Sequence, residues 1–158
     1  MIKLRQQTVD EYDSWSKKSR ETYTNENIKN GLSPKEAQQK TDDDFNRLLP
    51  EGRQSSGQYL FTIVNEISST NVETIGTLWF GVRGSEVYKK AFIYDIIIDE
   101  QYRSKGYGQQ AMNLLESEVK KLGLRHIGLH VFGHNTAARA VYEKLGYVMT
   151  NLNLEKVI

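Results

Sequence analysis

The residues best suited to chemistry form a short basic loop between a predicted strand and a predicted helix. The loop consists of Arg103, Ser104, Lys105, Gly106, Tyr107 and Gly108. The first turn of a helix leaves backbone N–H groups without intrahelical partners and carries the positive end of the helix dipole. Glycine lets the backbone adopt left-handed torsions and approach an anion closely, and the two cations add positive charge. The loop therefore predicts the binding of a pyrophosphate-bearing ligand.

Two familiar phosphate-binding loops fit this stretch less well. The chain contains no G-x-x-x-x-G-K-[ST] spacing, which excludes a P-loop. Gly106, Gly108 and Ala111 match the loose dinucleotide fingerprint, but that fingerprint needs its first glycine directly after the strand and an acidic residue about 20 positions later. Here the strand ends at Ile98, well before the loop, and the next strand end near Phe132 carries no acid. A Rossmann-type site is therefore disfavoured.

The loop resembles the acyl-coenzyme A loop of the GNAT superfamily of N-acetyltransferases, whose signature is [QR]-x-x-G-x-[GA]. Arg103, Gly106 and Gly108 fill that signature. A second block downstream, HVFGHNTAARAVYEKLGY, resembles the following strand and helix of the same superfamily. The resemblance covers Ala91 to Tyr147 and implies acetyl-coenzyme A as cosubstrate. It also implies the α/β GNAT fold, a mixed central sheet with the order β-α-α-β-β-β-α-β-α-β.

The resemblance also implies a role for the strand that precedes the loop. The main-chain groups of Ile96 and Ile98 would pair with the pantetheine arm, and the amide of Ile96 or Ile97 would face the thioester oxygen. Because such contacts use backbone groups, the identity of the side chains cannot support them. A buried strand without this role is the alternative.

Two residues of the second block are implied to act on the pantetheine side. Tyr142 stands where many relatives place a tyrosine general acid, and a phenol with a pKa near 10 is protonated at neutral pH and can donate to a leaving thiolate. It shares a helical face with Ala138 and Leu145, so a packing role is the alternative. Asn135 matches a position that contacts the pantetheine or its water, and it is also a good helix N-cap.

The residue that accepts the proton of the acceptor amine is left open. Asp95 lies in the strand before the loop, but strand alternation does not tell which face its side chain occupies. His130 is the second candidate because the pKa of an imidazole suits a general base. A chain of water molecules would serve equally well. Trp15 and Trp79 fit either a substrate pocket or the core.

Several classes of site are disfavoured by residue type and spacing. His126, His130 and His134 are four residues apart, which in a strand separates them by about 13 Å, so no shared metal ion is expected. The chain has no cysteine, which excludes disulfides, thiolate metal sites and an acyl-cysteine intermediate. Acetyl transfer would therefore proceed by direct attack of the amine in a ternary complex.

Length and charge set the broad class of the protein. The 158 residues, 38% of them hydrophobic, fit a single domain over 1–158. Lysine and arginine number 21 and acidic residues 20, so the net charge of +1 predicts no nucleic-acid surface. The N-terminus lacks an apolar run and no stretch approaches 18 apolar residues, so we expect neither a signal peptide nor a membrane span, and a cytoplasmic location.

Hydrophobic periodicity and capping residues predict the elements. Helices are expected from Thr8 to about Lys29, from Ser33 to about Leu49, after Gly108 up to Gly123, and between Asn135 and Gly146. Strands are expected around Ile2 and Leu4, over Tyr59 to Ile67, Thr74 to Val82, a run ending at Ile98, Arg125 to Phe132, and Tyr147 to Leu154.

The sequence as a whole predicts an N-acetyltransferase whose acceptor is a primary amine of a small molecule or a peptide. The alternative is a non-catalytic acyl-coenzyme A sensor, which would keep the glycine loop without needing Tyr142. We also expect a homodimer, because a chain that ends in a strand leaves a sheet edge to be covered. The C-terminal strand or the hairpin with Trp79 and Phe80 would supply the interface.

Overall fold

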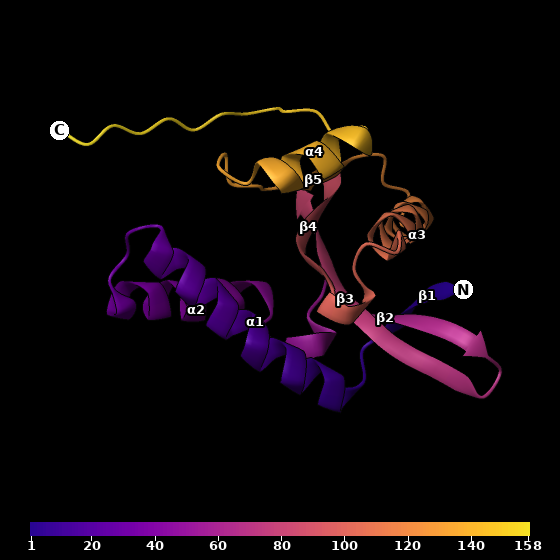
Figure 1. Cartoon of the computed structure of the whole chain (residues 1–158). Coiled ribbons are helices and arrows are strands. Elements are labelled where there is room, and N and C mark those ends of the chain that lie inside the picture. The colour runs from indigo at the N-terminus through magenta and orange to yellow at the C-terminus, as the bar shows by residue number, and fades with distance from the viewer. The chain divides into compact units, whose positions relative to one another are not determined.

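The computed structural model describes all 158 residues and contains five strands and four α-helices (Figure 1). The strands are β1 (Ile2–Gln6), β2 (Gln58–Ser68), β3 (Asn71–Gly84), β4 (Lys89–Ile98) and β5 (Ile127–Leu129). The helices are α1 (Val9–Lys29), α2 (Pro34–Leu48), α3 (Tyr107–Lys121) and α4 (Thr136–Lys144). The α/β class and the predicted order of elements up to α4 are confirmed.

The chain divides into two compact units, Met1–Gly128 and Leu129–Ile158. In the first unit, β1 to β4 pair with their sequence neighbours in an antiparallel meander. Next to β4, the amide of Ala91 donates to the carbonyl of His126, just before β5 (2.9 Å). Helices α1 and α2 lie on one side of the strands and α3 on the other (Figure 1). The two sides of the sheet are therefore covered by different helices.

Each face of the sheet has its own core. On the α1–α2 side, the buried cluster consists of Trp15, Phe45, Leu49, Leu60 and Trp79. Helix α3 buries Ala111, Met112, Leu115 and Val119. Burial of apolar surface of this size is the main favourable contribution to folding. No helix combines the length and apolarity that a membrane span requires.

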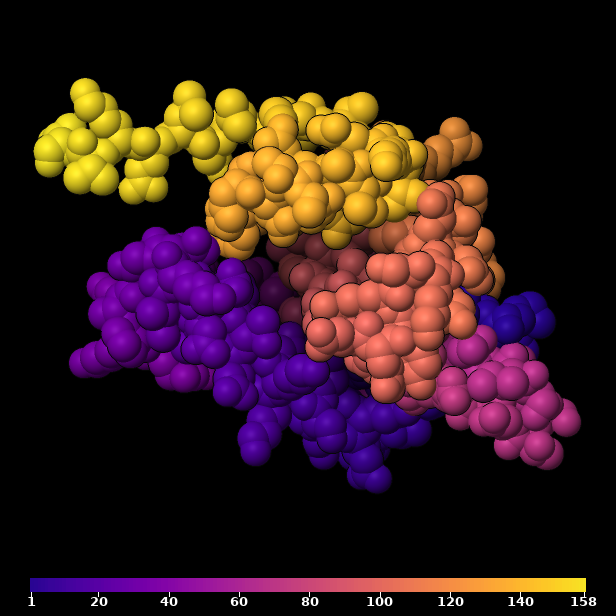
Figure 2. Space-filling view, viewed as in Figure 1, coloured from indigo at the N-terminus to yellow at the C-terminus, as the bar shows by residue number.

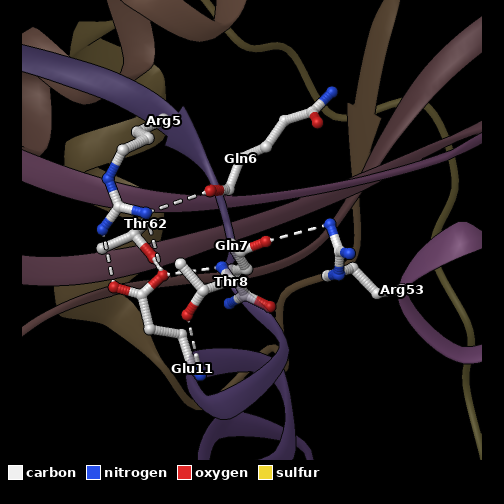
Figure 3. A network of polar contacts seen from close by, with 7 residues as sticks. All are labelled: Arg5, Gln6, Gln7, Thr8, Glu11, Arg53 and Thr62. Atoms are coloured by element: carbon white, nitrogen blue, oxygen red, sulfur yellow. Dashed lines mark hydrogen bonds and ion pairs between the residues drawn. The ribbon is translucent and has the colours of Figure 1, made fainter.

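The start of α1 is held by a polar network that joins three elements (Figure 3). Glu11 receives hydrogen bonds from the guanidinium of Arg5 (2.6 Å), the amide of Thr8 (2.9 Å) and the hydroxyl of Thr62 (2.9 Å). The Arg5 hydrogen bond is the main reason that the pKa of Glu11 is lowered to about 2, with burial opposing it. The network ties α1 to β1 and β2, and the predicted cap at Thr8 is confirmed.

Replacing Glu11 with glutamine should destabilise the fold by about 1–2 kcal/mol at neutral pH, a value reduced for the partial exposure of the pair. Because the pKa of Glu11 is lower in the folded chain, its contribution is complete above about pH 4.5 and is lost as the pH falls towards 2. Urea unfolding of both proteins at several pH values measures the difference. Glu26→Gln, which removes a surface pair with Lys29 in the same helix, is the control. If the difference in unfolding free energy between wild type and Glu11→Gln does not decrease in acid, the stabilising role of the ionised Glu11 is contradicted.

The predicted last strand is wrong, since residues 147–158 form no strand. After the amide of Tyr147, which donates to the carbonyl of Tyr142, the segment makes no backbone hydrogen bond, and Leu154 and Val157 are 87% and 91% exposed. In Figure 2 this yellow end of the chain extends away from α4 of its own unit. An alternating apolar pattern produces a strand only where a neighbouring strand pairs with its backbone.

The predicted role of Trp79 and Phe80 in a dimer interface is wrong. Trp79 and Phe80 are 4% and 0% exposed, so neither can contact a second subunit. Trp79 packs on Trp15 and Phe45, and Phe80 stacks on Tyr59. These side chains are core residues of the two faces of the sheet. The homodimer stays a prediction without these contacts.

Candidate functional site

A β-bulge in β4 decides which way the candidate base points. The register shifts between Trp79 and Phe80, so that Phe80 pairs with Ile93 and Trp79 pairs with Asp95. Tyr94 is therefore an extra residue, and a bulge of this kind can direct two consecutive side chains to one face of the sheet. The Tyr94 ring stacks on Trp79, with centroids 4.5 Å apart, and Asp95 contacts Trp15 of α1. Asp95 thus faces the α1–α2 side.

The environment of Asp95 favours a base. Its Oδ2 accepts a hydrogen bond from the indole Nε1 of Trp15 at 3.2 Å. Burial raises the pKa of Asp95 to about 6, although the hydrogen bonds from Trp15 and the Ile96 amide and the charge of Lys18 act against the rise. A carboxylate of this pKa is ionised at neutral pH and binds a proton more readily than an ordinary aspartate.

A shallow hollow lies between α1 and the turn that follows β4. It is lined by Lys18, Asp99, Glu100 and Gln101 and has a volume of about 610 Å³. Lys18 also acts electrostatically on Asp95, so the hollow and the candidate base share this residue. The hollow was not predicted, because its residues come from α1 and from a turn about 80 residues later in the chain.

The glycine loop has a backbone shaped for an anion. Gly106 caps α3 in the left-handed conformation (φ 77°), and Ser104 also has a positive φ of 60°. The amides of residues 104–109 have no hydrogen-bond partner within the protein, and the first intrahelical bond there is from Gln110 to the carbonyl of Gly106 (3.2 Å). A series of free amides at a helix N-terminus is the arrangement that binds phosphate groups.

The two glycines of the loop are needed for different reasons. Gly106 requires its positive φ, which side-chain-bearing residues rarely adopt. Gly108 has an ordinary φ, and a Cβ added there would meet only Cγ1 of Ile98, at a comfortable 3.9 Å. The fold itself therefore tolerates a side chain at position 108. A glycine there fits a site where a ligand approaches the backbone.

The cations of the loop are held by the chain without being neutralised. Arg103 donates through Nε to the carbonyl of Ile98 (2.9 Å), which ties the loop to the end of β4. The ammonium of Lys105 lies 5.6 Å from the centroid of the Tyr102 ring. Neither cation forms an ion pair with an acid, so both charges are available to a ligand.

The remaining predicted site residues lie in the second unit. The side chain of Asn135 accepts from the amide of Ala138 (3.1 Å), so its predicted capping role is confirmed. Tyr142 is partly buried, and its ring lies edge-to-face with that of Tyr147 at 5.7 Å. His130 is exposed and packs against Phe132, with ring centroids 5.2 Å apart. The roles of Asn135, Tyr142 and His130 in catalysis stay predictions.

Sequence reasoning missed two features of the site. The first is the hydrogen bond from Trp15 to Asp95, which joins residues 80 positions apart. The second is the bulge at Tyr94, for which the alternation of residues in β4 carries no signal. No three histidine, aspartate or glutamate side chains gather where they could hold a metal ion.

Comparison with known proteins adds an independent line of observation. The family model described as "Acetyltransferase (GNAT) family" matches residues 14–147. Two Bacillus subtilis proteins described as uncharacterized N-acetyltransferases are similar along their whole length: YdgE is 34% identical (97% of this chain, 96% of YdgE) and YycN is 32% identical (98% and 97%).

Solved structures and more distant relatives agree with these matches. The crystal structure of YycN superimposes with a TM-score of 0.87 at 31% identity, covering 100% of this chain and 99% of YycN. The ribosomal protein bS18-alanine N-acetyltransferase of Escherichia coli is 34% identical over 61 residues, which is 39% of this chain and 41% of that enzyme.

Proposed function

The chain belongs to the GNAT family of acetyltransferases, and we propose that it transfers the acetyl group of acetyl-coenzyme A to a primary amine by direct attack in a ternary complex. The observation that carries this proposal is the run of unpartnered amides over residues 104–109 at the N-terminus of α3. The family model covers parts of both compact units, which supports their acting as one catalytic domain.

The glycine loop fits the diphosphate of coenzyme A. Its free amides and the helix dipole would hold the phosphate oxygens, with the charges of Arg103 and Lys105 beside them. Strand β5 has three residues and β4 has ten, so most of the outer edge of β4 has no strand partner. Main-chain groups of Ile96, Ile97 and Ile98 are the proposed partners of the pantetheine arm there.

Asp95 is the proposed general base. When the amine nitrogen bonds to the acetyl carbon it must lose a proton, and a carboxylate held by Trp15 in a desolvated position can accept it. The bond from the acetyl carbon to sulfur then breaks, and the departing thiolate takes a proton for which Tyr142 is the proposed donor. His130 is the alternative base, but it is exposed and lacks the fixed position that Asp95 has.

The acceptor is a primary amine in this proposal. One relative is named for acetylating the alanine of a ribosomal protein, which supports an amine as the acceptor. The match to that relative covers too little of this chain to assign the same substrate to it. The hollow beside Lys18, with Asp99 and Glu100 in its lining, offers room for an acceptor near Asp95. A small molecule and a peptide terminus both remain within the proposed class.

A panel of amines mixed with acetyl-coenzyme A tests the proposal directly. Release of the coenzyme A thiol should depend on the amine, and the product should gain one acetyl group by mass. Isothermal titration with coenzyme A alone measures the binding step separately. Tight binding without turnover on any amine would favour the non-catalytic acyl-coenzyme A sensor instead.

Substituting valine for Gly108 should weaken coenzyme A binding by about tenfold or more, because the branched side chain keeps the phosphates away from the backbone. The fold should be retained, since only Ile98 lies within 4 Å of the added Cβ. Titration calorimetry of the folded variant measures the affinity. Asn113→Val makes a similar change on the exposed side of α3 and should bind normally. Unchanged affinity in the Gly108 variant would contradict the loop assignment.

A further inference from the structure

Arg83 is an exposed cation whose orientation is set by aromatic neighbours. It lies near the end of β3, and its Nε donates to the hydroxyl of Tyr94 at 2.8 Å. Its guanidinium carbon lies 3.6 Å from the ring centroid of Phe92 and 4.7 Å from that of Tyr94. The two terminal nitrogens have no hydrogen bond or ion pair within the protein. The side chain therefore offers an oriented pair of donors to an outside group.

A second cation stands directly opposite Arg83. Lys90 is its partner in the register of β3 and β4, and directly opposed residues of an antiparallel pair share one face. Like charges in such positions destabilise a sheet. The acid nearest in sequence, Glu86, pairs with Lys89 instead (3.3 Å). Two cations without an acidic partner therefore occupy opposed positions at the end of the β3–β4 pair.

The cations and the candidate base belong to one surface. Lys90, Phe92 and Tyr94 alternate along β4 on the same face, and the bulge adds Asp95 to that face. Tyr94 stacks on Trp79, which in turn packs edge-to-face on Trp15, the hydrogen-bond donor of Asp95. Because Tyr94 is the extra residue of the bulge, Phe92 and Asp95 pair with Gly81 and Trp79, which are two residues apart in β3, a span of about 7 Å. A small molecule could therefore contact both ends of the surface.

We propose that Arg83 and Lys90 form a subsite for an oxyanion of the acceptor, so that the substrate is a small amine that also carries a carboxylate or phosphate. The inference rests on the proposed acetyltransferase function and names its substrate class. The fork of an arginine matches the paired oxygens of both anions, and a guanidinium stacked on rings is held ready for them. The amine of the same molecule lies towards Asp95.

Matched pairs of acceptors test the subsite. O-phosphoethanolamine is compared with ethanolamine, and β-alanine with β-alaninamide, so that each pair differs mainly in the anion. With acetyl-coenzyme A, the wild type should show a kcat/KM about 10- to 100-fold higher for the anionic member of at least one pair, the range expected for hydrogen bonds to a charged group. The pair that shows the preference distinguishes phosphate from carboxylate. Equal or reversed preference in both pairs would overturn the proposal.

Variants separate the subsite from general effects of charge. Arg83→Met keeps the stem of the side chain and should abolish the preference while leaving the rate with the uncharged amine unchanged. Arg83→Lys keeps the charge without the fork and should retain part of the preference. Lys89→Met removes a neighbouring cation already paired with Glu86 and should behave as wild type. Equal losses on both members of a pair in Arg83→Met would overturn the subsite, provided that thermal unfolding shows an intact fold.

A binding measurement keeps the subsite testable if no amine is acetylated. Trp15 and Trp79 are the only tryptophans, and both belong to the cluster next to Tyr94, so their fluorescence reports on this surface. O-phosphoethanolamine should change it saturably, ethanolamine should not, and Arg83→Met should weaken the response about tenfold or more. Identical titrations of wild type and Arg83→Met would overturn the subsite. Absence of turnover with a normal titration would count against the acetyltransferase proposal alone.

Discussion

Asp95→Asn is expected to lower turnover by about 10²- to 10⁴-fold, the usual contribution of a general base. The amide has nearly the shape of the carboxylate and can still accept from Trp15, but it cannot take the proton of the amine. Steady-state rates with a good acceptor measure the loss. Binding of acetyl-coenzyme A should change little, because the glycine loop is untouched. A rate within a few-fold of wild type would leave His130 or water as the base.

The same substitution should stabilise the protein. Burial raises the pKa of Asp95 to about 6, so the folded chain binds this proton more tightly than the unfolded chain does. Stability is therefore lost as the pH rises from about 4 to about 6, and the cost is complete above that range. Because the carboxylate is only partly buried, we expect Asp95→Asn to gain about 1–2 kcal/mol at pH 7.5 and almost nothing at pH 4.

Two further variants test whether the effects of Asp95→Asn come from the buried carboxylate itself. Asp43→Asn changes an exposed aspartate of α2 and should alter neither rate nor stability at pH 7.5. Trp15→Phe removes the hydrogen bond that lowers the pKa of Asp95, so the acidic limb of the rate profile should move to higher pH. If the acidic limb of the pH–rate profile of Trp15→Phe stays at the wild-type pH, Trp15 has only a packing role. Urea unfolding at both pH values and a pH–rate profile are the measurements.

Tyr142→Phe is expected to reduce turnover by about 10²- to 10⁴-fold, because the ring is kept and the proton for the thiolate is lost. Acetyl-coenzyme A should still bind with nearly wild-type affinity, which calorimetry measures. The defect should be smaller with a thioester whose thiol is more acidic, since such a leaving group needs less protonation.

The control for this variant is Tyr88→Phe, which makes the same chemical change at an exposed tyrosine of the first unit. It should leave the rate unchanged. If Tyr142→Phe also retains a rate within a few-fold of wild type, Tyr142 only packs beside Tyr147. If the protein is instead a non-catalytic acyl-coenzyme A sensor, wild type and both variants should bind acetyl-coenzyme A without turnover.

Features that depend on short stretches of chain were predicted correctly from the amino-acid sequence. The cap at Thr8, the capping box at Ser33, the cap at Asn135 and a left-handed torsion in the glycine loop were all predicted from short stretches of sequence. Hydrophobic periodicity likewise located α3 and the β2–β3 hairpin. These features follow from local torsions and local hydrogen bonds, which the identity of a few neighbouring residues decides.

The errors arose where a pattern needs a distant partner. Alternation over Tyr147 to Leu154 predicted a strand, yet no neighbouring strand pairs with that segment, so it stays extended and exposed. Trp79 and Phe80 were expected at an interface, but pairing of β3 with both β2 and β4 places them in the two cores. The period of a strand shows that its faces differ without showing what covers each face.

The geometry of the candidate site depends on how the strands of the sheet pair. The bulge at Tyr94 depends on the register of β3 against β4, and it alone turns Asp95 towards Trp15. The same register places Arg83 directly opposite Lys90. Because a shift of one residue would move every side chain of β4 to the other face, these contacts follow from the pairing of whole strands. The residue types of the site were visible in the sequence, whereas their convergence required the sheet to be assembled.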